Sequence, residues 1–161
     1  MTRRIWLVAA LAVMLNSGCA KRPVVEQVVA VSADDPGMNA AIAKARATVG
    51  TFVTALRAPK KSQSGFAVKV RITDEGANEH FWLSDVRYDG SEFSGKIAND
   101  PERVFTVEVD QVVSARAAEI SDWMYVDNGK LVGGYTVRVL RDRLSSSDRA
   151  EFDRTMPFTV K

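Results

Sequence analysis

The chain has 161 residues, of which 46% are hydrophobic and 26% are charged, and this balance is typical of one globular domain. Basic residues outnumber acidic ones by 22 to 20, and residues 1–18 hold Arg3 and Arg4 but no acid, so the rest of the chain is formally neutral. Without a basic excess to displace counterions from phosphates, nucleic-acid binding is not expected.

Residues 1–18 have the order of an export signal: a basic head, an apolar run from Ile5 to Leu15, and small residues before Cys19. The run is too short for a membrane span of about 20 apolar residues. It resembles a bacterial lipoprotein signal peptide, in which the cysteine is acylated and becomes the first mature residue. Asn16 stands where such signals usually carry Leu. The alternative is a membrane anchor that is never cleaved.

Cys19 is the single cysteine, so a disulfide within the chain is excluded. The resemblance implies a lipoprotein with acyl chains, palmitate among them, on Cys19. Several acyl chains anchor a protein stably, because each buried methylene contributes about 0.8 kcal/mol. Ala20 follows the cysteine, and by resemblance to the sorting rule for such proteins this favours the outer membrane, facing the periplasm. We therefore expect an exported protein held in the cell envelope by its lipid.

Residues 19–35 indicate a lipidated tether, in which 28–31 form either an edge strand or linker. A helix is predicted to begin at Pro36, because Asp35 is a good N-cap and proline suits the first helical position. Steps of three and four residues then place one apolar stripe on a helix face: Met38, Ile42, Ala45, Val49, Phe52 and Leu56. Gly50 permits two shorter helices, and Pro59 ends the run.

Beyond residue 64 the apolar period changes to two, which indicates strands. Residues 79–88 carry apolar side chains on both faces, so this strand is expected to lie inside the sheet. Asp89-Gly90 predicts a hairpin turn. The predicted strands are 66–73, 79–88, 92–99, 105–113 and 119–126. Gly133-Gly134 is expected to form a tight turn, with an anion site at the next helix as the alternative.

Two helices, 135–144 and 148–154, complete the predicted order, and the pattern Ser145 to Asp148 resembles a capping box. The fold class is α+β: an N-terminal amphipathic helix, a curled antiparallel sheet of about five strands, and one or two C-terminal helices. We expect one domain over residues 36–155 and a tail over 156–161.

Several pieces of the strand region, in order, resemble the YegJ-like family, labelled domain of unknown function 2314. They are Phe66-Ala-Val-Lys69, Glu79-His80-Phe-Trp82-Leu83, Gly95 with Asn99-Asp-Pro101, Asp122-Trp123-Met124-Tyr125 and Gly129-Lys130-Leu-Val-Gly133-Gly134-Tyr135-Thr136. The resemblance covers roughly residues 36–145 and implies one small α+β domain. It implies no reaction. The family usually has Gly-Asp where this chain has Val109-Asp110.

No catalytic or metal site is predicted. His80 is the single histidine, so four-ligand zinc sites are excluded, and no Gly-x-Ser-x-Gly elbow selects a serine for nucleophilic chemistry. No cofactor is expected. A general-base role for His80, with Glu79, Asp85 or Asp122 orienting it, stays open as the enzyme hypothesis.

The residues favoured for binding are Glu79, His80, Trp82, Asp122, Trp123 and Tyr125. Trp and Tyr are favoured in binding surfaces because each combines an apolar body with a polar tip. They would line a pocket or patch if the strands that carry them were neighbours; the alternative is a filled sheet core. The first functional hypothesis is a non-catalytic, lipid-anchored binding protein for an envelope or protein partner. An enzyme using His80 and an inhibitor or immunity-type protein are the alternatives.

Overall fold

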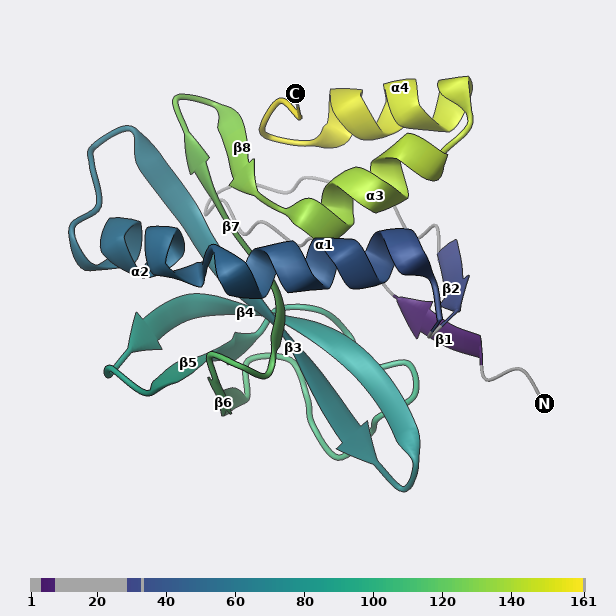
Figure 1. Cartoon of the computed structure of the whole chain (residues 1–161), viewed down its shortest axis with the longest axis horizontal. Coiled ribbons are helices and arrows are strands. Elements are labelled where there is room, and N and C mark those ends of the chain that lie inside the picture. The colour runs from purple at the N-terminus through teal and green to yellow at the C-terminus, as the bar shows by residue number, and fades with distance from the viewer. Residues whose placement is uncertain (1–3, 8–28, 33, 161) are drawn as a thin grey trace.

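A computed structural model describes residues 4–7, 29–32 and 34–160 of the chain (Figure 1). Cys19 and most of the predicted signal peptide and tether lie outside these residues. Strands β1 (Arg4–Leu7) and β2 (Val29–Ser32) pair antiparallel in a small sheet of their own, so β2 overlaps residues 28–31 without being an edge strand of the main sheet. Among the described residues, no helix is long and apolar enough to cross a membrane.

Two helices, α1 (Pro36–Ala47) and α2 (Val49–Arg57), follow one another along one side of the sheet (Figure 1). The predicted cap of α1 is confirmed: the Asp35 carboxylate accepts a hydrogen bond from the Met38 amide at 2.8 Å, with Pro36 in the first turn. The break between the helices falls at Thr48, before Gly50. The Thr48 hydroxyl donates to the Lys44 carbonyl at 2.7 Å and so closes the end of α1.

The main sheet is antiparallel and has six strands, in the order β6-β5-β4-β3-β7-β8. Its strands are β3 (Gln63–Asp74), β4 (Ala77–Tyr88), β5 (Glu92–Ile97), β6 (Val112–Arg116), β7 (Ile120–Asp127) and β8 (Lys130–Gly133). The α+β class is therefore confirmed, and β4 lies inside the sheet as its two apolar faces predicted. The strand that the sequence did not predict is the short β8, which ends at Gly133, the first residue of the glycine pair.

The strand predicted over 105–113 is wrong in its first part, because residues 98–111 form a loop and only Val112–Arg116 is a strand. Within that loop Val104 is fully buried, whereas Phe105 is 77% exposed. The apolar alternation of this segment therefore does not mark one buried strand face.

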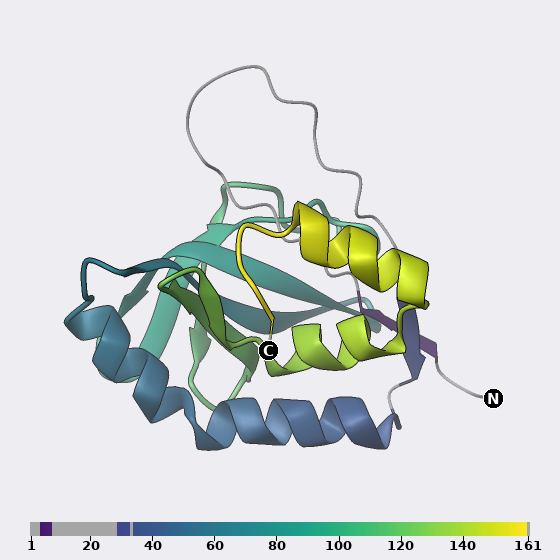
Figure 2. The same ribbon diagram turned by 90° about the horizontal axis from the view of Figure 1, so that it is seen from above.

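Helix α3 (Tyr135–Arg143) lies beside α1, and helix α4 (Ser146–Thr155) lies on the other side of α3 (Figure 2). The predicted cap at Ser145 is confirmed, since its hydroxyl accepts from the Asp148 amide. The segment after α4 packs back onto the sheet: Phe158 is buried, and Thr159 exchanges backbone hydrogen bonds with Gly129 and Leu131.

The sheet has an apolar core on each face. Under α1 and α2, Phe52 is fully buried with its ring centroid 5.6 Å from that of Trp123 and 5.8 Å from that of Phe93. The opposite face buries Trp82 and Met124 against α3 and the C-terminal segment. Both faces of β3, β4 and β7 are therefore covered over much of their length, which explains why their sequences carry apolar residues in both phases.

Candidate functional site

The six residues favoured for binding divide between the two faces of the sheet. β3 lies between β4 and β7, so the strands carrying Trp82 and Trp123 are not neighbours. In register, Trp82 stands opposite Lys69, whereas Trp123 stands opposite Val68 on the other face. All six residues are buried. The structure therefore groups His80, Trp82 and Asp122 on one face and Glu79, Trp123 and Tyr125 on the other.

Trp123 and Tyr125 belong to the core beneath α1 and α2. The Trp123 indole donates to the Ala45 carbonyl at 2.8 Å, so its polar tip is satisfied by backbone. The Tyr125 ring stacks on Phe66 with centroids 5.1 Å apart. These two rings hold the helices to β7.

Glu79 holds the loop after β5. Its carboxylate accepts hydrogen bonds from the backbone amides of Glu102, Arg103 and Val104, at 2.9–3.2 Å. A carboxylate that receives several N–H groups is well compensated for its burial. The same contacts explain why this stretch forms a loop, because its amides point at Glu79 and not at a neighbouring strand.

Asp122 caps helix α3. Its carboxylate accepts from the amides of Tyr135 and Thr136 and, at 2.6 Å, from the Thr136 hydroxyl. Burial raises the pKa of this carboxyl group. The glycine pair before α3 is a turn, with both residues at positive φ, and the helix N-terminus that follows it is occupied by Asp122. An external anion would have to displace this side chain.

His80 is 5% exposed and contacts Ser121, with 2.8 Å between Nδ1 and the hydroxyl oxygen. The Ser121 hydroxyl oxygen also lies 3.2 Å from the Lys69 carbonyl oxygen, to which it can donate. Desolvation, with Lys69, Arg71 and Arg46 nearby, lowers the pKa of His80 to about 3. Ser121 is 1% exposed, so both members of the pair are enclosed in the interior, where a substrate does not reach them.

Three buried donors without an acceptor among the described residues gather at Trp82: its own Nε1, Lys69 Nζ and Asn99 Nδ2. Lys69 Nζ lies 5.3 Å from the Trp82 ring centroid, and Asn99 Oδ1 accepts from the Trp82 amide. Desolvation lowers the pKa of Lys69 to about 8, against the attraction of Asp122. Unpaired buried donors are costly, so this is the least self-sufficient part of the interior.

Beside these donors the sheet forks and leaves a hollow. β3 pairs with β4 only from Val68 onward, and its earlier residues pair with β7; β4 beyond Leu83 continues beside β5. The two halves diverge on the α2 side of the molecule (Figure 1). The fork forms a groove of about 540 Å³, which we call the Trp82 groove. Its apolar wall includes Leu56, Phe66, Ala67, Trp82, Ala98 and Met124.

The rim of the Trp82 groove carries Asp85, Lys96 and Asp110. Lys96 Nζ lies 2.9 Å from Asp85 Oδ2, with both side chains about half exposed or more. Asp85 and Asp110 both have positive φ, 51° and 67°, which non-glycine residues rarely adopt. Such strain is concentrated at binding sites, and β4 has a register shift at Asp85. None of these three residues was among the predicted binding residues; the polar pair Ser84-Asp85, which interrupts the apolar run of β4, was the available signal.

The described residues contain no group of three or more His, Cys, Asp or Glu side chains that could hold a metal ion.

Comparison with known proteins then gives the family. The model described as "Uncharacterized protein conserved in bacteria (DUF2314)" matches residues 35–159. The chain belongs to the DUF2314 family.

Two known proteins are similar in sequence to this DUF2314 chain. It is 44% identical over 104 residues to "Uncharacterized protein YegJ" of Escherichia coli (strain K12), a match that covers 65% of this chain and 67% of that protein. It is 34% identical over 129 residues to "Putative ankyrin repeat protein NMB1133/NMB1171" of Neisseria meningitidis serogroup B (strain ATCC BAA-335 / MC58). That match covers 75% of this chain but about half, 51%, of the Neisseria protein. No solved structure matches the DUF2314 chain significantly.

Proposed function

We propose that this DUF2314 chain is a non-catalytic binding protein of the bacterial envelope, carried on a membrane by lipid at Cys19, that holds a protein partner in the Trp82 groove. The groove is the observation that supports it. It combines an apolar wall with strained, charged residues at its rim, the composition expected of a recognition site. His80 and its neighbour Ser121 are both buried, which offers no support for the enzyme hypothesis.

The rim indicates the chemistry of the partner. Lys96 neutralises Asp85, and Asp110 adds a further negative charge. A partner could insert an apolar side chain against the apolar wall of the groove. A basic residue next to that side chain would then pair with the Asp110 carboxylate, which Lys96 does not neutralise. We therefore propose a partner segment in which an apolar residue stands next to Lys or Arg.

Photo-crosslinking in the native host tests this proposal. A photoreactive amino acid replaces Val109 in the groove and, as the control, Glu151 on the exposed face of α4. We expect a discrete crosslinked protein from position 109 alone, and a loss of that product in Asp110→Asn, which keeps the backbone conformation but removes the charge. Equal products from both positions, or a product unaffected by Asp110→Asn, would contradict the groove. A crosslinked partner that is a toxic enzyme would favour an inhibitor role for the same groove.

The lipid anchor needs its own test. We expect radiolabelled palmitate to be incorporated into the native chain and to be absent from Cys19→Ser, with the native chain fractionating with outer membranes. Native chain found unmodified in the cytosolic fraction would overturn the anchor while leaving the Trp82 groove to be judged by crosslinking.

A further inference from the structure

Among the described residues, no strand pairs with the last residues of β3 on the side of β7. β3 continues to Asp74, but its ladder with β7 ends where Val70 pairs with Ile120. No described strand continues the ladder past that pair. The end of β3 is therefore a sheet edge, although β3 lies in the interior of the strand order.

The direction of the open hydrogen-bonding groups follows from the hairpin. Asp74 and Ala77 flank a two-residue turn, Glu75-Gly76, in which both residues have positive φ, so Asp74 and Ala77 form a hydrogen-bonded pair. Alternate residues of an antiparallel strand bond to opposite neighbours. Ile72 therefore bonds toward β4, and the N–H and C=O groups of Arg71 and Thr73 face the open side.

A hollow of about 600 Å³ lies against this edge, and it has no lining residue in common with the Trp82 groove. Val70 and Ile72 of β3 form one wall, and Val113 and Ala115 of β6 form the other. Strands in a sheet lie about 4.8 Å apart, so a hollow between two strands has the shape to receive a third. We call it the β3 edge slot.

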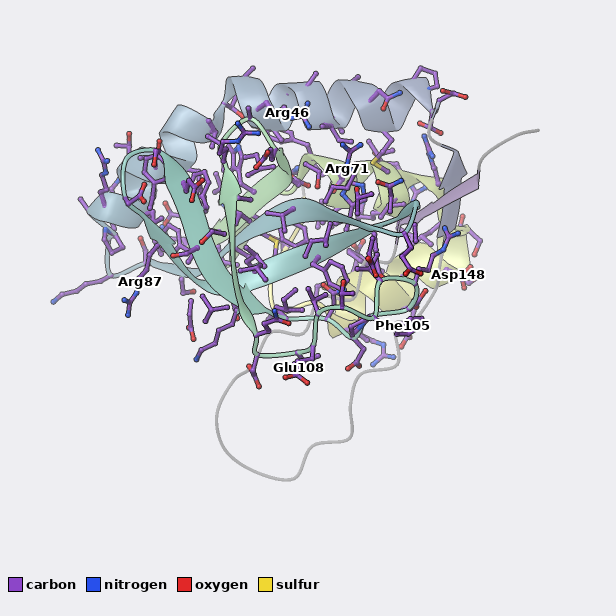
Figure 3. The ribbon with its side chains drawn as sticks, turned by 90° about the horizontal axis from the view of Figure 1, so that it is seen from below. Arg46, Arg71, Arg87, Phe105, Glu108 and Asp148 are labelled. Carbon is purple, nitrogen blue, oxygen red and sulfur yellow. The ribbon has the colours of Figure 1, made fainter. Side chains whose placement is uncertain are left out.

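The charge of the slot is positive. Arg46 and Arg71 both line it and point to the same side of the molecule (Figure 3). Among the described residues, Arg46 donates from Nε to the Ile120 carbonyl at 2.9 Å, a contact that does not use its terminal nitrogens. Glu119 also lines the slot, but it is paired with Arg116, whose guanidinium lowers the pKa of the Glu119 carboxyl group.

We propose that the β3 edge slot binds an extended acidic peptide segment of a partner protein, which adds a short strand to β3 at Arg71 and Thr73. Its alternate apolar side chains lie between β3 and β6, and its acidic side chains meet Arg46 and Arg71. Strand addition of this kind takes affinity from backbone hydrogen bonds and specificity from alternate side chains. The proposal does not depend on the Trp82 groove.

The test uses the full chain and a fluorescent peptide, acetyl-Val-Glu-Val-Glu-Val-amide, titrated by anisotropy, with backbone amide signals followed by NMR. One control peptide has Lys in place of Glu, and another is N-methylated at the residues whose amides would face β3. The protein variants are Arg71→Gln and, as a matched control, Arg87→Gln, an exposed arginine outside the slot (Figure 3).

We expect saturable binding that shifts the Arg71 and Thr73 amide signals. Binding should weaken roughly tenfold on N-methylation, since two ladder hydrogen bonds are lost, and roughly threefold in Arg71→Gln but not in Arg87→Gln. Equal binding of the N-methylated peptide would show attraction by charge alone and overturn strand addition. No saturable binding, or shifts centred on the Trp82 groove, would overturn the slot as a binding site.

Discussion

Lys69 offers a direct test of the interior of this protein. Its side chain is fully buried, and its ammonium nitrogen has no hydrogen-bond acceptor among the described residues. Desolvation lowers its pKa from 10.5 to about 8, which corresponds to a cost on the order of 3 kcal/mol for folding with Lys69 charged. Replacing Lys69 by Met keeps an unbranched apolar stem and removes the charge. We therefore expect Lys69→Met to be more stable at pH 7.

The attraction between Lys69 and Asp122 is already contained in the lowered pKa of Lys69, so about 3 kcal/mol is the net electrostatic cost that Lys69→Met removes. The pH dependence is the sharper signature. Below pH 8 the folded and unfolded chains both hold the Lys69 proton, and the cost is fully present. Between about pH 8 and 10.5 the unfolded chain binds more protons than the folded one, so the native chain gains stability as pH rises. Lys69→Met should lack this gain.

Urea unfolding of the native chain and of Lys69→Met at pH 7, 8, 9 and 10 measures both effects, with Lys61→Met as an exposed control. We expect the advantage of Lys69→Met to shrink steadily across that range, and Lys61→Met to follow the native chain. A Lys69→Met chain less stable than the native chain at pH 7, or an advantage that does not change with pH, would refute this account of Lys69.

Three further predictions concern other parts of the interior. His80 has a pKa of about 3, so its imidazole NMR signals should not titrate from pH 7 to 4 in the folded chain, and a midpoint near 6.5 would contradict its burial. The unfolded chain takes up the His80 proton near pH 6.5, so the free energy of unfolding should fall as the pH drops below this value. Glu79→Gln should lower the free energy of unfolding by about 1–3 kcal/mol, because an amide group then faces the amides of 102–104, whereas exposed Glu92→Gln should change it little in the same urea titration. In thermal unfolding, Gly133→Ala should lower the free energy of unfolding by about 2 kcal/mol more than Gly129→Ala. Both glycines have a φ of 72°, but only at Gly133 would a Cβ collide with Trp123. Equal destabilisation by the two substitutions would mean that backbone strain alone matters.

Local patterns predicted the parts of this fold that local chemistry determines. Asp35 and Ser145 cap their helices because the cap bond joins residues three apart, and the two apolar phases of β4 follow from burial on both sides. The first part of the strand predicted over residues 105–113 is wrong. It follows residues 102–104, whose amides are held in a loop by Glu79, more than 20 residues earlier, and no period in the sequence reports such a contact.

The candidate site was predicted in part. Trp82 does lie at a groove, but Trp123 and Tyr125 face the opposite core, since the insertion of β3 between β4 and β7 is a property of the strand order. The rim residues Asp85 and Asp110 are brought together by a register shift and a loop, and their positive φ is visible only in the folded chain. Hydrophobic periodicity identifies faces of single strands and not the order in which the strands assemble.

The central claim is that the Trp82 groove is occupied by a partner in the cell, and the labelling rate of a thiol placed in the groove tests it most directly. Ser84→Cys lies in the groove, Ser146→Cys lies on exposed α4, and the unsubstituted chain gives the background from Cys19. We predict that a polar maleimide labels Ser84→Cys more slowly in permeabilised cells than in purified protein, while Ser146→Cys reacts at the same rate in both. Equal rates for Ser84→Cys in cells and in purified protein would contradict the claim.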